Sequence, residues 1–305
     1  MEALLHRIPL TLPLLALPLA AQAEAPHVVT DLPAVHSLVS QVMGELGAPE
    51  LLLGAGASAH SYQLRPSQAR SLQSADLVFW IGPEMTPWLE RTLNSLGEGA
   101  TQVALIDREG TTLREFAEEE DEHHEEDEHD HGTIDPHAWL DPTNAQHWLG
   151  VIAGALSQQD PENRPTYEVN AQKAAAAIAA LDAQLTADLA MAQDTPFIVF
   201  HDAYGYFTSH FGLQNAGSVA LGDAAAPGVA RISALRQTLE DSGAACAFPE
   251  AQHDPKQMEL LIEGTSVRLG GALDPSGSSL EPGPALYGQL LEKMSETLIA
   301  CLSAR

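Results

Sequence analysis

Basic residues are scarce in this chain, and their scarcity excludes several classes of partner. Of the 305 residues only 14 are Lys or Arg, against 42 Asp or Glu, so the formal net charge at pH 7 is −28. A surface with this charge repels the phosphates of nucleic acids and anionic lipid headgroups. We therefore expect neither nucleic acid nor a membrane surface as a partner, and we expect small cations to concentrate around the protein.

Long apolar runs are also rare, and the clearest one lies at the N-terminus. A Leu-rich stretch, residues 8–20, follows Arg7 and is closed by the small residues Ala21 and Ala23. Because the stretch is short and interrupted by prolines, it is more typical of a secretory signal peptide than of a membrane span. We predict that residues 1–23 are a signal peptide and that the mature protein is soluble and exported.

Cysteine occurs only twice, as Cys246 and Cys301. In an oxidising export compartment an even number of cysteines favours one disulfide, which would fasten the last predicted helix. The alternative is two unrelated buried thiols.

What is present in abundance is an alternation of short apolar runs with helical patterns. This alternation predicts an α/β fold with mainly parallel sheets. An Ala-rich segment from Pro165 to about Gln193 predicts one helix of about 28 residues, roughly 40 Å long. We expect two α/β lobes, residues 24–160 and 194–305, joined by this long rigid linking helix within 161–193. The predicted strands are 28–30, 51–53, 77–81, 103–106, 197–200, 217–221, 244–248 and 267–273, and the predicted helices besides the linking one are a stretch ending at 43, then 66–75, 85–96, 142–158, 229–241, 255–264 and 284–302.

One segment consists only of acidic residues and histidine. Residues 118–131 comprise ten Asp or Glu and four histidines, namely His123, His124, His129 and His131. Like charges repel and nothing in the run is apolar, so we predict a disordered acidic His-rich loop over 117–132. Carboxylates and imidazoles bind divalent metals, which makes the loop a predicted weak, secondary metal site.

Three other histidines lie in places where ligands usually occur. His60 follows the predicted strand at 51–53, His201 ends the predicted strand at 197–200, and His137 lies between two prolines. Loops at strand ends on a rigid scaffold commonly carry binding residues. A single histidine at such a place is more often an ordinary hydrogen-bonded residue than a ligand, but three of them in an acidic exported protein favour a metal site.

The sequence around these histidines resembles a known family. The motifs are His60-Ser-Tyr-Gln-Leu-Arg-Pro-Ser, Asp135-Pro-His137 with Trp139, Phe200-His201-Asp-Ala-Tyr-Gly-Tyr-Phe-Thr and Leu273-Asp-Pro. In this order, and with the acidic His-rich segment before the second motif, they are similar to the periplasmic zinc-binding components of bacterial zinc ABC importers, within a larger family that also carries manganese. The resemblance covers essentially the whole mature chain.

The resemblance implies a metal site in the cleft between two lobes, with His60, His137 and His201 as protein ligands. Three imidazoles suit zinc better than manganese, which prefers oxygen ligands. Zinc is usually four-coordinate. Some relatives carry a carboxylate just before the first histidine, where this chain has Ala59, so the fourth ligand is either Asp274 or a water molecule. Asp135 and Asp202 are candidates either for orienting the imidazoles or for capping a helix.

The expected function is capture of Zn²⁺ in the periplasm and delivery to the permease of an inner-membrane ABC importer, by a monomer that is not an enzyme. Three histidines with an open position also describe a zinc-dependent hydrolase, although the sequence has no His-Glu-x-x-His motif. A manganese or other divalent-metal binding protein, or a periplasmic metal buffer without an importer, are further alternatives.

Overall fold

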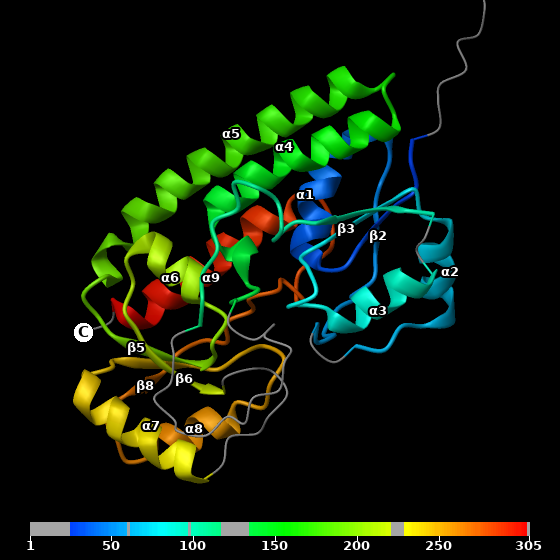
Figure 1. Cartoon of the computed structure of the whole chain (residues 1–305). Coiled ribbons are helices and arrows are strands. Elements are labelled where there is room, and N and C mark those ends of the chain that lie inside the picture. Colours follow the sequence, from blue (N-terminus) through cyan, green and yellow to red (C-terminus); the bar gives the residue numbers. More distant parts are fainter. Residues whose placement is uncertain (1–24, 60–61, 97–98, 117–133, 221–228, 304–305) are drawn as a thin grey trace, which may run out of the picture.

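The computed structural model describes residues 25–59, 62–96, 99–116, 134–220 and 229–303 (Figure 1). The predicted signal peptide, the predicted ligand His60 and the acidic His-rich segment with its four histidines lie outside the described residues. The described residues include the other two predicted ligands, His137 and His201, and the candidate fourth ligand Asp274.

The first sheet is parallel and has the strand order β2-β1-β3-β4. Strands β1 and β3 are buried along their whole length, because helices cover both faces of the sheet. Asp31, directly after β1, accepts a hydrogen bond from the backbone N–H of Ile81 at 2.9 Å, which joins the ends of β1 and β3. The strands are β1 (Val28–Thr30), β2 (Glu50–Leu51), β3 (Leu77–Trp80) and β4 (Thr101–Ala104).

The second sheet repeats this plan with the parallel order β6-β5-β7-β8. In both sheets the second strand in the chain lies on one side of the first strand, and the third strand lies on its other side. The strand order therefore reverses beside β1 and beside β5. Such a reversal opens a crevice at the carboxyl ends of the strands, where ligands of open α/β sheets bind. The strands are β5 (Phe197–His201), β6 (Asn215–Ala220), β7 (Cys246–Phe248) and β8 (Arg268–Leu269).

Helices form the outer layers and one shared inner layer. A small apolar cluster lies between the first sheet and α2 and α3, and another between the second sheet and α7 and α8. The largest cluster contains residues from both sheets and from the helices between them. The helices are α1 (Pro33–Met43), α2 (Pro66–Ser74), α3 (Pro87–Leu96), α4 (Pro142–Gln159), α5 (Arg164–Leu189), α6 (Gly205–Phe211), α7 (Val229–Ser242), α8 (Lys256–Ile262) and α9 (Leu286–Leu302), with short 3₁₀ helices at Gly44–Leu46, Ala138–Leu140 and Ala190–Ala192.

The long helix α5 links the two lobes, and it packs beside α4 along one side of the molecule (Figure 1). Pro165 in its first turn and the run of alanines favour the helix, as the sequence predicts. In the described part of the chain, the helix Arg164–Ala192 is the one stretch long and apolar enough to cross a membrane. It contacts α1, α4 and α9 and buries Tyr167, Ile178 and Leu189, which accounts for its apolar residues within the folded protein.

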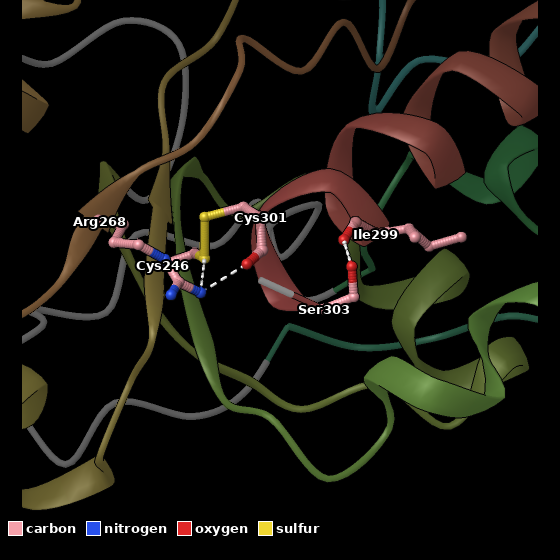
Figure 2. Close-up of a disulfide and its surroundings, with 5 residues drawn as sticks. All are labelled: Cys246, Arg268, Ile299, Cys301 and Ser303. Atoms are coloured by element: carbon pink, nitrogen blue, oxygen red, sulfur yellow. Dashed lines mark hydrogen bonds between the residues drawn. A yellow bond between two sulfur atoms is a disulfide. The ribbon is translucent and has the colours of Figure 1, made fainter. Parts of the chain in front are cut away.

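The C-terminal helix α9 is fastened at both of its ends. At its start, the backbone N–H of Tyr287 donates to the hydroxyl of Ser37 on α1 at 3.0 Å. At its end, Cys301 forms a disulfide with Cys246 of β7 (Figure 2). The guanidinium of Arg268 also donates to the carbonyl of Cys301 at 2.6 Å. The predicted disulfide is therefore present, and α9 connects the second sheet to helices of the first lobe.

The α/β fold with two parallel-stranded lobes and a linking helix is confirmed, and two local predictions need correction. The strand predicted at 267–273 is limited to β8, because the chain departs from β7 after Gly270 and meets it again only in a bridge between Leu273 and Glu250. Helix α6 was not predicted: its sequence, Gly205–Phe211, has low helix propensity, and burial of Tyr206, Phe207 and Phe211 stabilises it instead.

Candidate metal centre

His137 is held rigidly between a proline and a short helix. Pro136 precedes it and the 3₁₀ helix Ala138–Leu140 follows it. Its backbone N–H donates to the carboxylate of Asp135 at 3.0 Å, and its ring atom Nδ1 lies 2.7 Å from the same oxygen, Oδ1. Both side chains are almost completely buried. A buried carboxylate at Nδ1 directs the other ring nitrogen, Nε2, toward any ligand.

His201 is the last residue of β5, and its side chain is 3% exposed. Its Nδ1 lies 3.4 Å from Oε2 of Glu250. Glu250 comes shortly after β7, the strand that lies next to β5 in the sheet. Glu250 is 3% exposed and also accepts a hydrogen bond from the hydroxyl of Tyr204 at 3.4 Å. His201 therefore resembles His137 in having a buried carboxylate beside Nδ1.

The fold brings these two histidines together from different lobes. Their ring centroids are 5.0 Å apart, with the planes at 73°. The ring of Trp139 lies 5.2 Å from that of His137, and its indole N–H donates to the carbonyl of Pro275 at 2.8 Å. Two imidazoles at this separation are close enough to contact one ion, as the ligand prediction requires. Within the described residues, which omit His60, no group of three or more His, Cys, Asp or Glu is arranged to hold a metal.

The residues on either side of positions 60 and 61 are anchored to α3. The indole N–H of Trp88 donates to the carbonyl of Ala59 at 2.6 Å. The rings of Tyr62 and Trp88 lie 5.4 Å apart. His60 itself stays a predicted ligand.

Asp274, the predicted alternative for the fourth ligand, lies in a loop whose groups surround its carboxylate. Oδ1 accepts hydrogen bonds from the N–H of Ser278 at 3.0 Å and from the hydroxyl of Ser276 at 3.2 Å. Oδ2 accepts from the N–H and the hydroxyl of Ser279 at 2.7 and 2.6 Å. In this arrangement Asp274 organises its own turn, a common role for Asp before Pro.

Two residues at this centre were not identified from the sequence as functional. Glu250 is one acidic residue among 42, and only the pairing of β5 with β7 places it at His201. Tyr206 is the other: its hydroxyl donates to the carbonyl of Asp135 at 2.9 Å and accepts from the N–H of Arg114 at 2.9 Å. Burial raises the pKa of Tyr206, with a further rise from Asp135, so the hydroxyl stays protonated and able to donate.

Asp202 is a third acidic residue near His137 and His201, after Asp135 and Glu250. Its backbone N–H donates to the carbonyl of Ala220 at 3.2 Å. Burial raises the pKa of its carboxyl group, and the charge of Asp135 raises it further, whereas His137 and His201 act in the opposite direction. The centre thus combines two imidazoles with several carboxylates, a set of groups that attracts a divalent cation.

Comparison with known proteins identifies the family. A family model described as "Zinc-uptake complex component A periplasmic" matches residues 28–301. The "High-affinity zinc uptake system protein ZnuA" of Paracoccus denitrificans (strain Pd 1222) is 52% identical over 309 residues, which cover 94% of each chain. The protein of the same description from Brucella suis biovar 1 (strain 1330) is 38% identical over 310 residues, which cover 92% of each chain.

Solved structures share the fold. A crystal structure of ZnuA superposes with a TM-score of 0.73 at 22% identity, covering 90% of this chain and 99% of that one. The periplasmic zinc binding protein TroA from Treponema pallidum gives 0.78 at 18% identity, covering 92% and 99%. With the family model spanning both lobes, the chain belongs to the ZnuA family, the periplasmic component A of zinc-uptake complexes.

Proposed function

We propose that this protein captures Zn²⁺ in the periplasm and delivers it to an inner-membrane ABC importer. The observation that carries the proposal is the pair of buried imidazoles, His137 and His201, whose ring centroids are 5.0 Å apart where the two lobes meet. Membership of a zinc-uptake family supports zinc as the cargo. The high-affinity zinc uptake proteins of Paracoccus and Brucella are similar over nearly the whole chain.

We propose His60, His137 and His201 as the three protein ligands and a water molecule as the fourth. Both carboxylate oxygens of Asp274 already accept hydrogen bonds from serines of their own loop, which supports water over Asp274. Ligation by Asp274 would require the carboxylate to give up several of these bonds. Asp274 remains the alternative fourth ligand.

The acidic His-rich segment is proposed to bind zinc weakly and separately from this site. Its histidines, His123, His124, His129 and His131, supply imidazole ligands among ten carboxylates. A chain segment without apolar residues must lose conformational entropy to close around an ion, which lowers its affinity. We propose capture, buffering or sensing of zinc as its role.

The tight site is tested by single substitutions measured with a competing chelator. His60→Ala, His137→Ala and His201→Ala are each expected to weaken zinc binding by at least about tenfold, because each removes one bond to the metal. His27→Ala serves as the matched control and should bind zinc like the wild type, because His27 precedes β1 and lies 3.7 Å from Glu50. Wild-type affinity in all three site variants would refute the ligand assignment.

As a component of a zinc-uptake complex, the protein has an ABC permease with its ATPase as partner and zinc as cargo. We propose that it acts as a monomer, because one chain contains both lobes and both described histidines. The family is a transport component and not an enzyme, which disfavours the hydrolase alternative. Restoration of growth in zinc-poor medium that depends on the importer would distinguish transport from simple metal buffering.

A further inference from the structure

Glu250 is a buried acidic residue at the point where the strand order of the second sheet reverses. It follows β7, which pairs in parallel with β5, while β6 lies on the other side of β5. Because β5 and β7 end at the same edge of the sheet, Glu250 and the last residue of β5, His201, face the same crevice. Glu250 is held there by a bridge to Leu273, whose N–H and carbonyl bond to the backbone on either side of Glu250.

The carboxylate of Glu250 contacts three side chains. Oε2 lies 3.4 Å from Nδ1 of His201 and accepts the hydroxyl hydrogen of Tyr204 at 3.4 Å. Oε1 lies 3.8 Å from Nε2 of His253, whose ring stacks on Phe200 with a centroid separation of 4.4 Å. A buried carboxylate is costly unless polar groups surround it. The fold therefore maintains this group at a specific place, next to one nitrogen of one imidazole.

The first lobe contains a similar arrangement with a shorter distance. Asp135, 1% exposed, is hydrogen-bonded to Nδ1 of His137 at 2.7 Å, whereas Glu250 lies 3.4 Å from Nδ1 of His201. Two histidines from different lobes thus each present Nδ1 to a buried carboxylate. An imidazole that donates its Nδ1 hydrogen to a carboxylate has Nε2 unprotonated and more basic, which is the form that binds a metal.

We propose that Glu250 is a positioning residue of the metal site: its contact with Nδ1 orients the ring of His201 so that Nε2 is the nitrogen that binds the metal. Tyr204 and His253 in turn fix the orientation of the Glu250 carboxylate. This inference rests on the proposed function, because it presumes that His201 is a zinc ligand. It assigns a role to a residue that does not itself contact the metal.

The test compares Glu250→Gln with Glu259→Gln. The two substitutions remove the same charge, but Glu259 is exposed on α8. Zinc affinity is measured by chelator competition, and the tautomer of His201 by ¹⁵N spectra of its ring in the metal-free protein. Glu250→Gln should lower zinc affinity by about 10- to 100-fold, the range typical for loss of a carboxylate behind a ligating histidine. It should also shift the His201 tautomer, which a purely structural role would leave unchanged.

Two further variants keep the outcomes separable. Glu250→Asp keeps the charge but retracts the carboxylate by one methylene, so its affinity should lie between those of the wild type and Glu250→Gln; it also serves if the Gln variant fails to fold. His201→Ala tests the site itself. If His201→Ala still binds zinc tightly, the proposed site is wrong; if His201→Ala loses zinc while Glu250→Gln and Glu259→Gln bind alike, only the role of Glu250 is wrong.

Discussion

At the scale of single residues, the chemistry of each side chain depends on which groups its neighbours present. Asp274 and Glu250 are both acidic residues that follow strand-like runs in the sequence. The carboxylate of Asp274 is surrounded by serine hydroxyls and backbone N–H groups, whereas that of Glu250 faces two imidazoles and a phenol. The first environment stabilises a turn, and the second is suited to orienting a ligand.

Substitution of Asp274 separates these roles. Asp274→Ala removes the acceptor for Ser276, Ser278 and Ser279, so we expect a loss of stability of about 1–3 kcal/mol, measured by chemical denaturation. Zinc affinity should stay within about threefold of the wild type, a change of under 1 kcal/mol, because water is the proposed fourth ligand. A drop as large as that of a histidine variant would instead make Asp274 a ligand.

From the sequence, His201 was a candidate because it ends a strand and His137 because it lies between two prolines, and the resemblance to a zinc-binding family implied that both are ligands. Asp135 could also be suggested, because it lies two residues from His137. Glu250 could not, because 48 residues separate it from His201 and nothing in the sequence distinguishes it from other acidic residues. Its role depends on the pairing of β5 with β7, which is a property of the sheet.

At the scale of elements, His210 of α6 joins helices that belong to different parts of the molecule. Its Nδ1 lies 3.3 Å from Asp141, the N-cap of α4, and its Nε2 lies 2.7 Å from Asp182 of α5. These two carboxylates, that of Asp141 first, raise the pKa of His210 to about 9. Burial raises the pKa of Asp141, but hydrogen bonds from His210 and Thr143 outweigh it, so the pKa is lowered overall.

The raised pKa of His210 predicts a pH-dependent contribution to stability. An unfolded histidine has a pKa of about 6.5, so the folded state binds this proton more tightly. The stabilisation is complete below about pH 6.5 and is lost as the pH rises toward 9. His210→Gln should therefore lower the free energy of unfolding near pH 6 by on the order of 1–3 kcal/mol and have little effect above pH 9.

The measurement is chemical denaturation of the metal-free protein across this pH range. Asp182→Asn provides the matched variant, and a double-mutant cycle with His210→Gln isolates the contact between α5 and α6. An equal destabilisation by His210→Gln at pH 6 and pH 9.5 would contradict the ion-pair account, because it would point to lost packing against Phe211 instead.

Helices and strands were predictable from the sequence where their amino-acid composition strongly favours one type of secondary structure. The alanines of α5 and the apolar runs of β3 and β5 predicted their structures, because propensity and burial agree there. Helix α6 and the short β8 were not predicted correctly, because tertiary packing determines both. The aromatic side chains of α6 are buried, and a Cβ on Gly270 would lie 2.4 Å from the ring of Phe248.

At the scale of the whole molecule, the two lobes share one apolar core and several fixed contacts. The hydroxyl of Tyr287 on α9 donates to the carbonyl of Trp139 at 2.8 Å, and the Cys246–Cys301 disulfide joins α9 to the second sheet (Figure 2). The linking helix α5 runs along both lobes (Figure 1). Because these contacts fix the two lobes to each other, no large movement is needed to bring His137 and His201 together.

The proposed division between a tight site and a weakly binding segment is tested on the whole chain. Deleting residues 118–131 should leave one tightly bound zinc per protein and remove the weaker zinc, because the segment contributes none of the proposed tight ligands. Titration with zinc, followed by calorimetry and by metal analysis after dialysis, measures both classes. Replacing the four histidines of the segment by Gln, with its length unchanged, controls for the deletion. Loss of the tight zinc in either variant would contradict this division.

The sequence by itself determined the class of fold, the acidic surface and the residue types suited to a divalent metal, because these follow from composition and from local patterns. Only the tertiary structure decided which carboxylate lies behind which imidazole. Asp135 and His137 are neighbours in the chain, but His137 and His201 are 64 residues apart, and Glu250 reaches His201 only through the order of the strands. Contacts between distant residues arise from packing and strand pairing, which no local pattern specifies.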